Sequence, residues 1–440
     1  MMQSILFIVV ASLALAYAFR EFGKLRRNIL LGKDEAVTGN VATRWKNVVL
    51  IALGQKKMFT RFTPAIFHFF IYAAFLLTQI ELIEIFIDGI FGTHRFFAPL
   101  LGGLYTFVIS LIEVLSVLAF VATFVFLARR NLLKIPRFQK SELDGFPRLD
   151  ANIILLLEVV LIVGIFSMNG ADAVLQNIFA DHYKPTGAFA VSSWLGPLLF
   201  GGLSQATLIG IERFGWWLHI STVFAFLCYL PHSKHLHVFL SFPNVYFAKL
   251  TKKGQMENMP TVMNEVKNML GIAVTNENIL QENESIEFGA NDVTNLSWKN
   301  VMDAYSCTEC GRCTAVCPAN LTGKKLSPRK VMMDVRDRAT EIGNYLTVNK
   351  IDKKDFSDGK SLFDRITPEE LHACTTCNAC VEACPVLINP LDIILQMRRY
   401  EILTLSQGPT DWLPMFNSLE NSGAVWQMPA ERAAWAQEVA

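Results

Sequence analysis

The sequence predicts a mainly α-helical protein in two parts, a five-helix transmembrane bundle followed by a water-soluble helical domain. Hydrophobic residues make up 52% of the 440 residues, a high fraction for an ordinary soluble globule. Nearly all long apolar runs lie before residue 245, whereas charged residues and Asn dominate after it. A third observation concerns the second part, in which a run of four cysteines followed by proline occurs twice.

Five segments of the first part are each long enough to cross a bilayer, which takes about 20 mostly apolar residues. The first has no basic residue before its apolar run and is followed by "REFGKLRRN", which distinguishes it from a secretory signal and favours an anchor with its N-terminus outside. The five expected spans cover approximately residues 2–19, 63–87, 104–128, 152–169 and 214–240.

The charges of the connecting segments predict the orientation of the bundle. Residues 20–62 contain ten Lys and Arg and residues 129–151 contain six, whereas 88–103 and 170–205 contain one each. Positive charge marks the cytoplasmic side, so everything after residue 242 is expected in the cytoplasm. Residues 190–212, broken by Gly and Pro, are expected to form an external re-entrant or interfacial piece. The formal net charge is +1, and outside the membrane-flanking loops no basic tract carries interleaved aromatics, which argues against nucleic-acid binding.

The composition divides the chain into four regions. The second is polar and contains one modest amphipathic stretch near "VMNEVKNMLGIAV", which indicates a linker or a peripheral helix. The last contains "FNSLENSGAVW" and "ERAAWAQE" and is expected to dock a partner. The expected regions are a transmembrane domain at 1–242, the linker at 243–295, the cysteine-rich domain at 296–400 and the tail at 401–440.

The two cysteine runs, "CTECGRCTAVCP" and "CTTCNACVEACP", have the spacing that holds iron–sulfur cubes. In such a pair, three thiolates wrap one cluster and the fourth crosses to the other cluster. One [4Fe–4S] cluster is therefore expected on Cys307, Cys310, Cys313 and Cys384, and the other on Cys374, Cys377, Cys380 and Cys317. Zinc more often uses paired knuckles, and disulfides are disfavoured in a reducing cytoplasm. The ninth cysteine, Cys228, lies in an apolar run and is expected to be a small buried hydrophobe.

Helices are expected beside the cysteine runs. One begins near Ser327 and Pro328. Another begins after Thr367, with Pro368 at its first position and a glutamate at its third, the pattern of a capping box. His372, at the end of that second helix, is expected to be structural and not a ligand.

Histidines within the apolar segments suggest a second kind of metal centre, since ionisable groups in a bilayer are costly. His68 and His237 are expected at similar depth near the cytoplasmic side, and this pair could be the axial ligands of a b-type haem or two polar interfacial residues. On one continuous helix, His219 would share a face with His237 at about 27 Å from it, too far for one metal. His232 and His235, with Lys234, are expected to form a basic interfacial cluster.

Four carboxylates also lie within the expected spans. They either carry protons to or from a quinone or pair with other spans and the water interface; they are Glu81, Glu84, Glu113 and Glu158.

The run "LPHSKHLHVFLSFPNV" resembles the cytochrome b subunits of respiratory nitrate reductase (gamma type) and of membrane heterodisulfide reductase. The segment "LSWKNVMDAYSCTECGRCTAVCPANLTGKKLSPRKVMMDVR" and the tail resemble the ferredoxin-like part of heterodisulfide reductase and its fused relatives. The resemblance implies a two-cluster ferredoxin-like core, haem b and quinone as substrate. Where the nitrate reductase cytochrome has a second histidine in its second span, this chain has Thr78 and Gln79, so His219 would bind haem with another ligand or line a quinone pocket. Fused relatives continue into Cys-Cys-Gly domains, which a separate subunit would supply here.

These observations together predict a multi-pass protein of a prokaryotic cytoplasmic membrane, the electron-transfer subunit of a quinone-linked oxidoreductase complex. It would connect quinone, through haem b and two [4Fe–4S] clusters, to a soluble partner that carries Cys-Cys-Gly domains. Other partners that the resemblance implies are an electron-transfer flavoprotein and a dehydrogenase. Two alternatives stay open, a haem-free iron–sulfur anchor of a dehydrogenase and a cluster-based redox sensor without enzymatic activity.

Overall fold

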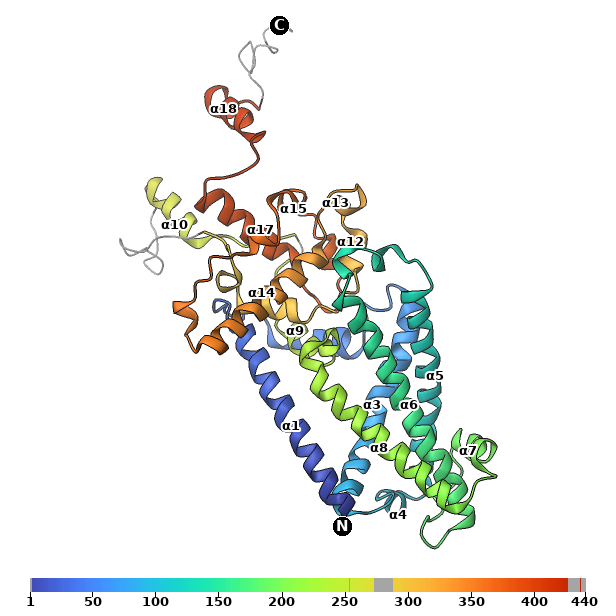
Figure 1. Cartoon of the computed structure of the whole chain (residues 1–440). Helices are drawn as coiled ribbons and strands as arrows, with labels where there is room; N and C mark the ends of the chain where they lie inside the picture. The colour runs from blue at the N-terminus through green and yellow to red at the C-terminus, as the bar shows by residue number, and fades with distance from the viewer. Residues whose placement is uncertain (1, 253, 273–287, 426–435, 437–440) are drawn as a thin grey trace.

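The computed structural model describes residues 2–252, 254–272, 288–425 and 436, and this part of the chain is helical without a strand. Five helices are long and apolar enough to span a membrane, which confirms the predicted number of spans. They run side by side below the cysteine-rich domain in Figure 1, with the N-terminus at the far end of the bundle. The five helices are α1 (Met2–Ile29), α3 (Phe62–Phe91), α5 (Gly103–Asn131), α6 (Phe146–Ile178) and α8 (Gln205–Tyr229).

Glycines allow α6 and α8 to approach closely. A Cβ added at Gly215 would lie 2.6 Å from the backbone nitrogen of Met168, and one added at Gly164 would lie 3.0 Å from that of His219. Small residues at such contacts let membrane helices pack backbone to backbone. The contact fixes the position of His219 against α6.

The fifth span does not follow the prediction of one helix over 214–240. Ser204 caps α8 by accepting a hydrogen bond from the Thr207 amide, so the helix begins nine residues earlier. It ends at Tyr229, because Pro231 cannot donate the next helical hydrogen bond, and two 3-10 turns follow (Leu230–His232 and Lys234–Leu236). The chain resumes as α9 (His237–Tyr246).

This break corrects one prediction. His219 and His237 lie on different helices, so the argument from a shared helical face does not apply to them. Residues 190–212, expected to be an external re-entrant or interfacial piece, form α7 (Ser192–Phe200), a turn, and the first part of α8. Figure 1 shows α7 at the end of the bundle away from the iron–sulfur domain.

The second part of the chain folds around α14 (Pro328–Asn349), whose apolar face is buried against α11 (Trp298–Tyr305) and α17 (Pro390–Arg399). Ser327 caps α14, and Thr367 forms a capping box with Glu370 at the start of α15 (Pro368–His372), as the sequence predicts. The shorter helices here are α12 (Arg312–Val316), α13 (Pro318–Leu321) and α16 (Ala379–Ala383).

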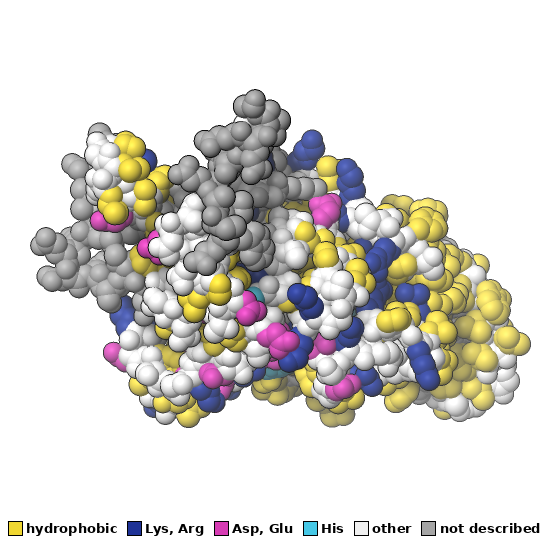
Figure 2. Space-filling model, turned by 90° about the horizontal axis from the view of Figure 1, so that it is seen from above, with side chains coloured by type: hydrophobic (Ala, Val, Ile, Leu, Met, Phe, Trp, Pro, Cys, Tyr) yellow, Lys and Arg dark blue, Asp and Glu magenta, His cyan; other side chains and the backbone are white. Residues whose placement is uncertain are grey.

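The C-terminal end of α1 joins the two parts. Arg27 donates a hydrogen bond to the Gly343 carbonyl (3.1 Å) and Asn28 donates one to the Tyr305 hydroxyl (3.1 Å). In Figure 2, seen from the iron–sulfur side, Lys and Arg side chains lie between the mainly polar domain surface and the yellow apolar flank. The domain therefore sits on the membrane bundle through both buried contacts and a basic boundary.

Four further α-helices complete the set of α-helices in the described residues. Residues 260–269 form a helix in the expected linker, and α18 extends away from the domain in Figure 1. The expected docking sequence "ERAAWAQE" lies almost wholly outside the described residues. The four regional boundaries predicted from composition stay predictions. The four helices are α2 (Val41–Asn47), α4 (Ala98–Leu101), α10 (Pro260–Met269) and α18 (Trp412–Ser422).

Candidate metal centres

The two cysteine runs adopt the same backbone conformation. Glu309 and Gly311 in the first run, and Thr376 and Asn378 at the matching positions of the second, all have φ between 54° and 69°. These left-handed residues turn each run around the point on which its first three thiols converge. Each run then enters a short helix, α12 or α16, and the two helices pack against each other. The sequence duplication is thus a structural one.

The structure brings the eight thiols together in two groups. The cysteines of the first group interact electrostatically with one another, as do those of the second. Cys384 thus lies with the thiols of the first run and Cys317 with those of the second, and the assignment of these cysteines as cluster ligands stays a prediction. The first cysteine group is Cys307, Cys310, Cys313 and Cys384, and the second cysteine group is Cys374, Cys377, Cys380 and Cys317.

The chemistry of these thiols fits iron–sulfur clusters. Burial raises the pKa of Cys307, Cys380 and Cys384 to about 12, so a bound cation is needed to hold them as thiolates. Backbone amides donate to the sulfurs of Cys384 (from Ile388, 3.3 Å) and Cys374 (from Thr376, 3.4 Å). Hydrogen bonds to cluster sulfurs help to set cluster potentials.

The spacing of the thiols bears on the choice between a single zinc ion and a cube. All nine cysteines, which lie within the described residues, are free thiols. The described residues hold no group of three or more His, Cys, Asp or Glu placed around a single metal ion. One zinc ion needs its four ligands within about 2.3 Å. A cube binds each thiolate through a different iron and so accepts a wider arrangement.

The first cysteine group faces the membrane bundle. Arg130, Arg137 and Arg312 all interact electrostatically with Cys310. Arg312 also donates to the Lys57 carbonyl (3.1 Å), just before α3, and lies near His68. Positive charge around an anionic cluster favours its reduced form, so a cluster here would be easier to reduce than one without such neighbours.

Glu309 links the first cysteine group to the membrane part through a buried ion pair. It lies between Cys307 and Cys310, and its carboxylate accepts hydrogen bonds from Lys234 Nζ and from Arg336 (2.7 Å). Lys234 is buried in this contact. Sequence reasoning missed this contact because its partners lie far apart in the chain.

The second cysteine group lies farther out. Cys377 is the exposed member of the eight cysteines. Arg398 donates to the Cys374 carbonyl (2.6 Å). His372 contacts Glu401 (2.9 Å) and packs edge-on against Trp412 (ring centroids 5.1 Å apart), which agrees with a structural role. The exposed thiol makes this group the accessible end of the pair.

His68 and His237 lie together, with ring centroids 6.5 Å apart. Two imidazoles that share one metal at about 2.0–2.1 Å have ring centres roughly 6.3 Å apart. The Nδ1 atom of each is already engaged, by Gln55 Oε1 (3.1 Å) and the Lys234 carbonyl (3.0 Å) respectively. These contacts leave each Nε2 to bind a metal, since a metal-ligating histidine usually has its other ring nitrogen held in a hydrogen bond of this kind. The pair therefore fits the axial ligands of a haem.

A third histidine, His235, stacks on His237 with centroids 5.8 Å apart and packs edge-on against Phe226 with centroids 5.3 Å apart. His219 is separate from this group: it lies on α8, with Nδ1 3.1 Å from the Leu161 carbonyl. In the described part of the chain the structure does not bring it to another histidine.

Comparisons with known proteins identify the cysteine-rich region. Two family models, each described as a 4Fe-4S dicluster domain, match residues 306–388 and 255–322. The chain is 27% identical to a probable iron-sulfur-binding oxidoreductase, FadF, of Bacillus subtilis, over 99% of this chain and 61% of the relative. It is 25% identical to an EtfAB:quinone oxidoreductase of Syntrophomonas wolfei, over 93% of this chain and 56% of the relative.

A shorter match reaches a heterodisulfide reductase. Residues covering 23% of this chain are 32% identical to 48% of one component of the CoB-CoM heterodisulfide reductase from Methanosarcina acetivorans. No solved structure matches the chain. The chain spans about three-fifths of the length of the first two relatives. It is a membrane-anchored protein with a 4Fe-4S dicluster domain, related to iron–sulfur oxidoreductases.

Proposed function

We propose that this chain is a membrane-bound electron-transfer subunit that connects quinone to a soluble redox partner through haem b and two [4Fe–4S] clusters. The haem would be held by His68 and His237, and the clusters by the first and second cysteine groups. When bound, these groups supply one-electron transfer, and the protein supplies ligands, spacing and electrostatics.

The single observation that carries the proposal is the continuity of the three centres. Arg312 lies between the first cysteine group and His68, and Lys234 bonds both to Glu309 in the first cysteine run and, through its carbonyl, to His237. The first cysteine group is packed against the second through α12 and α16. We therefore infer that electrons pass between the haem, the first group, the second group and the partner in this order. They would enter or leave at the exposed Cys377.

The polypeptide would tune this path by charge. Three arginines surround Cys310, whereas Arg398 is the arginine that interacts with Cys374. We infer a higher potential for the first cluster than for the second. The partner expected at the second cluster is a subunit with Cys-Cys-Gly domains, and the iron–sulfur domain would face the cytoplasm of a prokaryotic cell, in line with the basic loops on that side.

Metal and haem analysis of the purified, anaerobically isolated protein tests the proposal. We expect about eight irons and eight sulfides in clusters per chain, together with a b-type band in the reduced-minus-oxidised visible spectrum. His68→Ala and His237→Ala should each abolish the band, while His182→Ala, at an exposed residue, should retain it. Clusters without any b-type band would instead favour the haem-free anchor, and absence of iron and sulfide would refute the proposal.

A further inference from the structure

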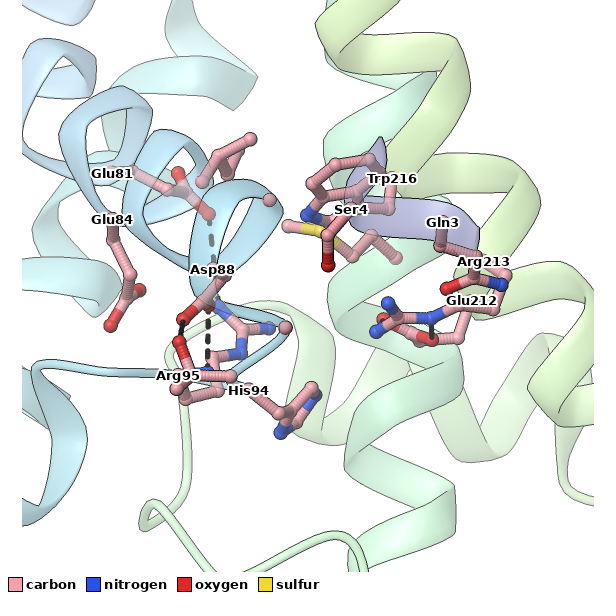
Figure 3. Close-up of a pocket in the computed structure, with 15 residues that line it drawn as sticks. Gln3, Ser4, Glu81, Glu84, Asp88, His94, Arg95, Glu212, Arg213 and Trp216 are labelled. Carbon is pink, nitrogen blue, oxygen red and sulfur yellow. Dashed lines mark hydrogen bonds and ion pairs between the residues drawn. The ribbon is translucent and has the colours of Figure 1, made fainter. Parts of the chain in front are cut away.

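A pocket lies at the end of the bundle opposite the iron–sulfur domain, between α1, α3, α6 and α8. We call it the acidic pocket; its volume is about 80 Å³, and Figure 3 shows the polar side chains that converge on it. Its rim includes Gln3 and Thr93, which are exposed. Its lining includes Glu81, Glu84, His94, Arg95, Glu212 and Trp216.

Three of the four carboxylates that the sequence singled out have hydrogen-bond donors. Glu84 accepts from the Phe97 amide (2.8 Å) and the Tyr105 hydroxyl (2.7 Å). Glu113 accepts from the amides of Val191 (2.8 Å) and Ser192 (3.0 Å). Glu158 accepts from Thr123 (3.0 Å). For these three, the structure supports the interpretation of pairing within the bundle.

Glu81 is different. Its side chain is buried, with the residue 2% exposed, and within the described chain no hydrogen bond of normal geometry reaches either carboxylate oxygen, although the Asn169 side chain lies close by. Its ion pair with Arg95 is long, 3.9 Å. Arg95 is shared, because it also bonds Asn169 (2.6 Å) and Asp172 (3.2 Å). A buried carboxylate without donors is costly, so water or a proton is needed to satisfy it.

The size of the pocket limits which molecules can form hydrogen bonds with the Glu81 carboxylate. A site of about 80 Å³ has room for two or three water molecules, with the polar partners that buried water requires. It is too small for a quinone ring and its tail. The pocket is therefore suited to a short chain of waters that joins Glu81 to the rim.

We propose that Glu81 is the proton-exchange group of this water-filled pocket. The inference rests on the proposed function: oxidation of one quinol yields quinone, two electrons and two protons, and the electrons pass to the haem and the clusters. Each proton binds a Glu81 carboxylate oxygen, giving the neutral acid, and then leaves through the waters to the outer surface, which regenerates the carboxylate. Quinone reduction uses the same path in reverse.

The charges around Glu81 favour such exchange. Arg95, on the loop after α3, faces it, as do Glu84 of α3, Glu113 of α5 and Asn169 of α6. His94, Asp172 and the pair Glu212–Arg213 lie toward the pocket and its rim. Carboxylates thus outnumber guanidinium groups around the pocket, which attracts protons from the outer surface.

Redox-induced infrared difference spectroscopy of the complete, cofactor-loaded protein tests Glu81 without requiring quinone turnover. We expect a carboxylic C=O band that shifts in heavy water, is lost in Glu81→Gln and is retained in Glu81→Asp. Glu158→Gln, which changes another buried carboxylate outside the acidic pocket, should keep the band. An unchanged band in Glu81→Gln, or no such band in the wild type, would overturn the proposal.

Quinol-dependent reduction of the clusters gives the second measurement. We expect Glu81→Gln to slow it by about tenfold or more at equal cluster content, with dithionite reduction unchanged, while Glu158→Gln stays within about twofold. A rate that depends on Na⁺ and not on pH would overturn the proposal in favour of a cation site. If even the wild type shows no reduction by quinol, the proposed function fails, and the infrared experiment still decides the role of Glu81.

Discussion

Replacing Glu309 by Gln removes the negative charge that ties the first cysteine run to the membrane part. Glu309 is 3% exposed and binds both Lys234 and Arg336. In the variant, Lys234 keeps the Pro147 carbonyl (2.6 Å) and a distant Asp150 (3.9 Å). A buried ammonium group would thus lose its closest counter-ion.

The expected cost follows from this burial. Removing one partner of a buried ion pair costs about 3–5 kcal/mol. Because Asp150 and, for Arg336, Asp337 (3.0 Å) compensate in part, we expect about 3 kcal/mol. That value corresponds to a roughly 150-fold increase in the equilibrium constant for local opening of the first cysteine run. The matched control is Glu369→Gln, since Glu369 and Lys325 form an exposed pair at 2.6 Å worth at most about 1 kcal/mol.

The rate at which an iron chelator removes the first cluster reports this opening when closing is faster than extraction. We expect extraction from Glu309→Gln to be about 100-fold faster than from the wild type and extraction from Glu369→Gln to be within about fivefold. The double variant Lys234→Met/Glu309→Gln should recover part of the loss, because it removes the orphaned charge. Equal extraction rates in Glu309→Gln and Glu369→Gln would refute the reasoning.

Three further predictions concern the centres and their support. Cys384→Ser should remove the cluster of the first group alone, so that acid-labile sulfide falls from about eight to about four per chain. Loss of the other cluster alone would contradict the crossed assignment. Gln55→Leu should weaken haem binding about 10–100-fold by freeing Nδ1 of His68, measured as haem retention during dilution; full retention would show that this contact is dispensable. Gly343→Ala should destabilise the junction by about 1–3 kcal/mol, because its Cβ would lie 1.9 Å from the Asn28 Oδ1 atom. Adding Asn28→Ala to the same chain should restore thermal stability, and no rescue would place the strain elsewhere.

The elements that depend on local sequence were predictable. Five apolar runs give the five spans, and the capping residues Ser327 and Thr367 start the helices expected of them. The duplicated cysteine spacing identifies the dicluster domain that the family models match. Each of these signals lies within a few residues or within one repeated pattern.

The features that depend on distant contacts were not predictable. The position of His237 follows from the helix break at Pro231. The apolar stretch continues to about residue 240, so hydropathy alone predicts one unbroken helix there. The bond between Lys234 and Glu309 joins residues 75 positions apart, and no periodicity relates them. The membrane carboxylates look alike in sequence, and only their donors in the folded chain distinguish Glu81 from the rest.

Freeze-quenched electron paramagnetic resonance of membranes mixed anaerobically with quinol tests most directly whether the three centres form one path. In the wild type we expect reduced-cluster signals to appear. In His237→Ala, which keeps both cysteine groups, we expect them to be absent with quinol and restored by dithionite. Cluster reduction by quinol at the wild-type rate in His237→Ala would contradict a path through the histidine pair.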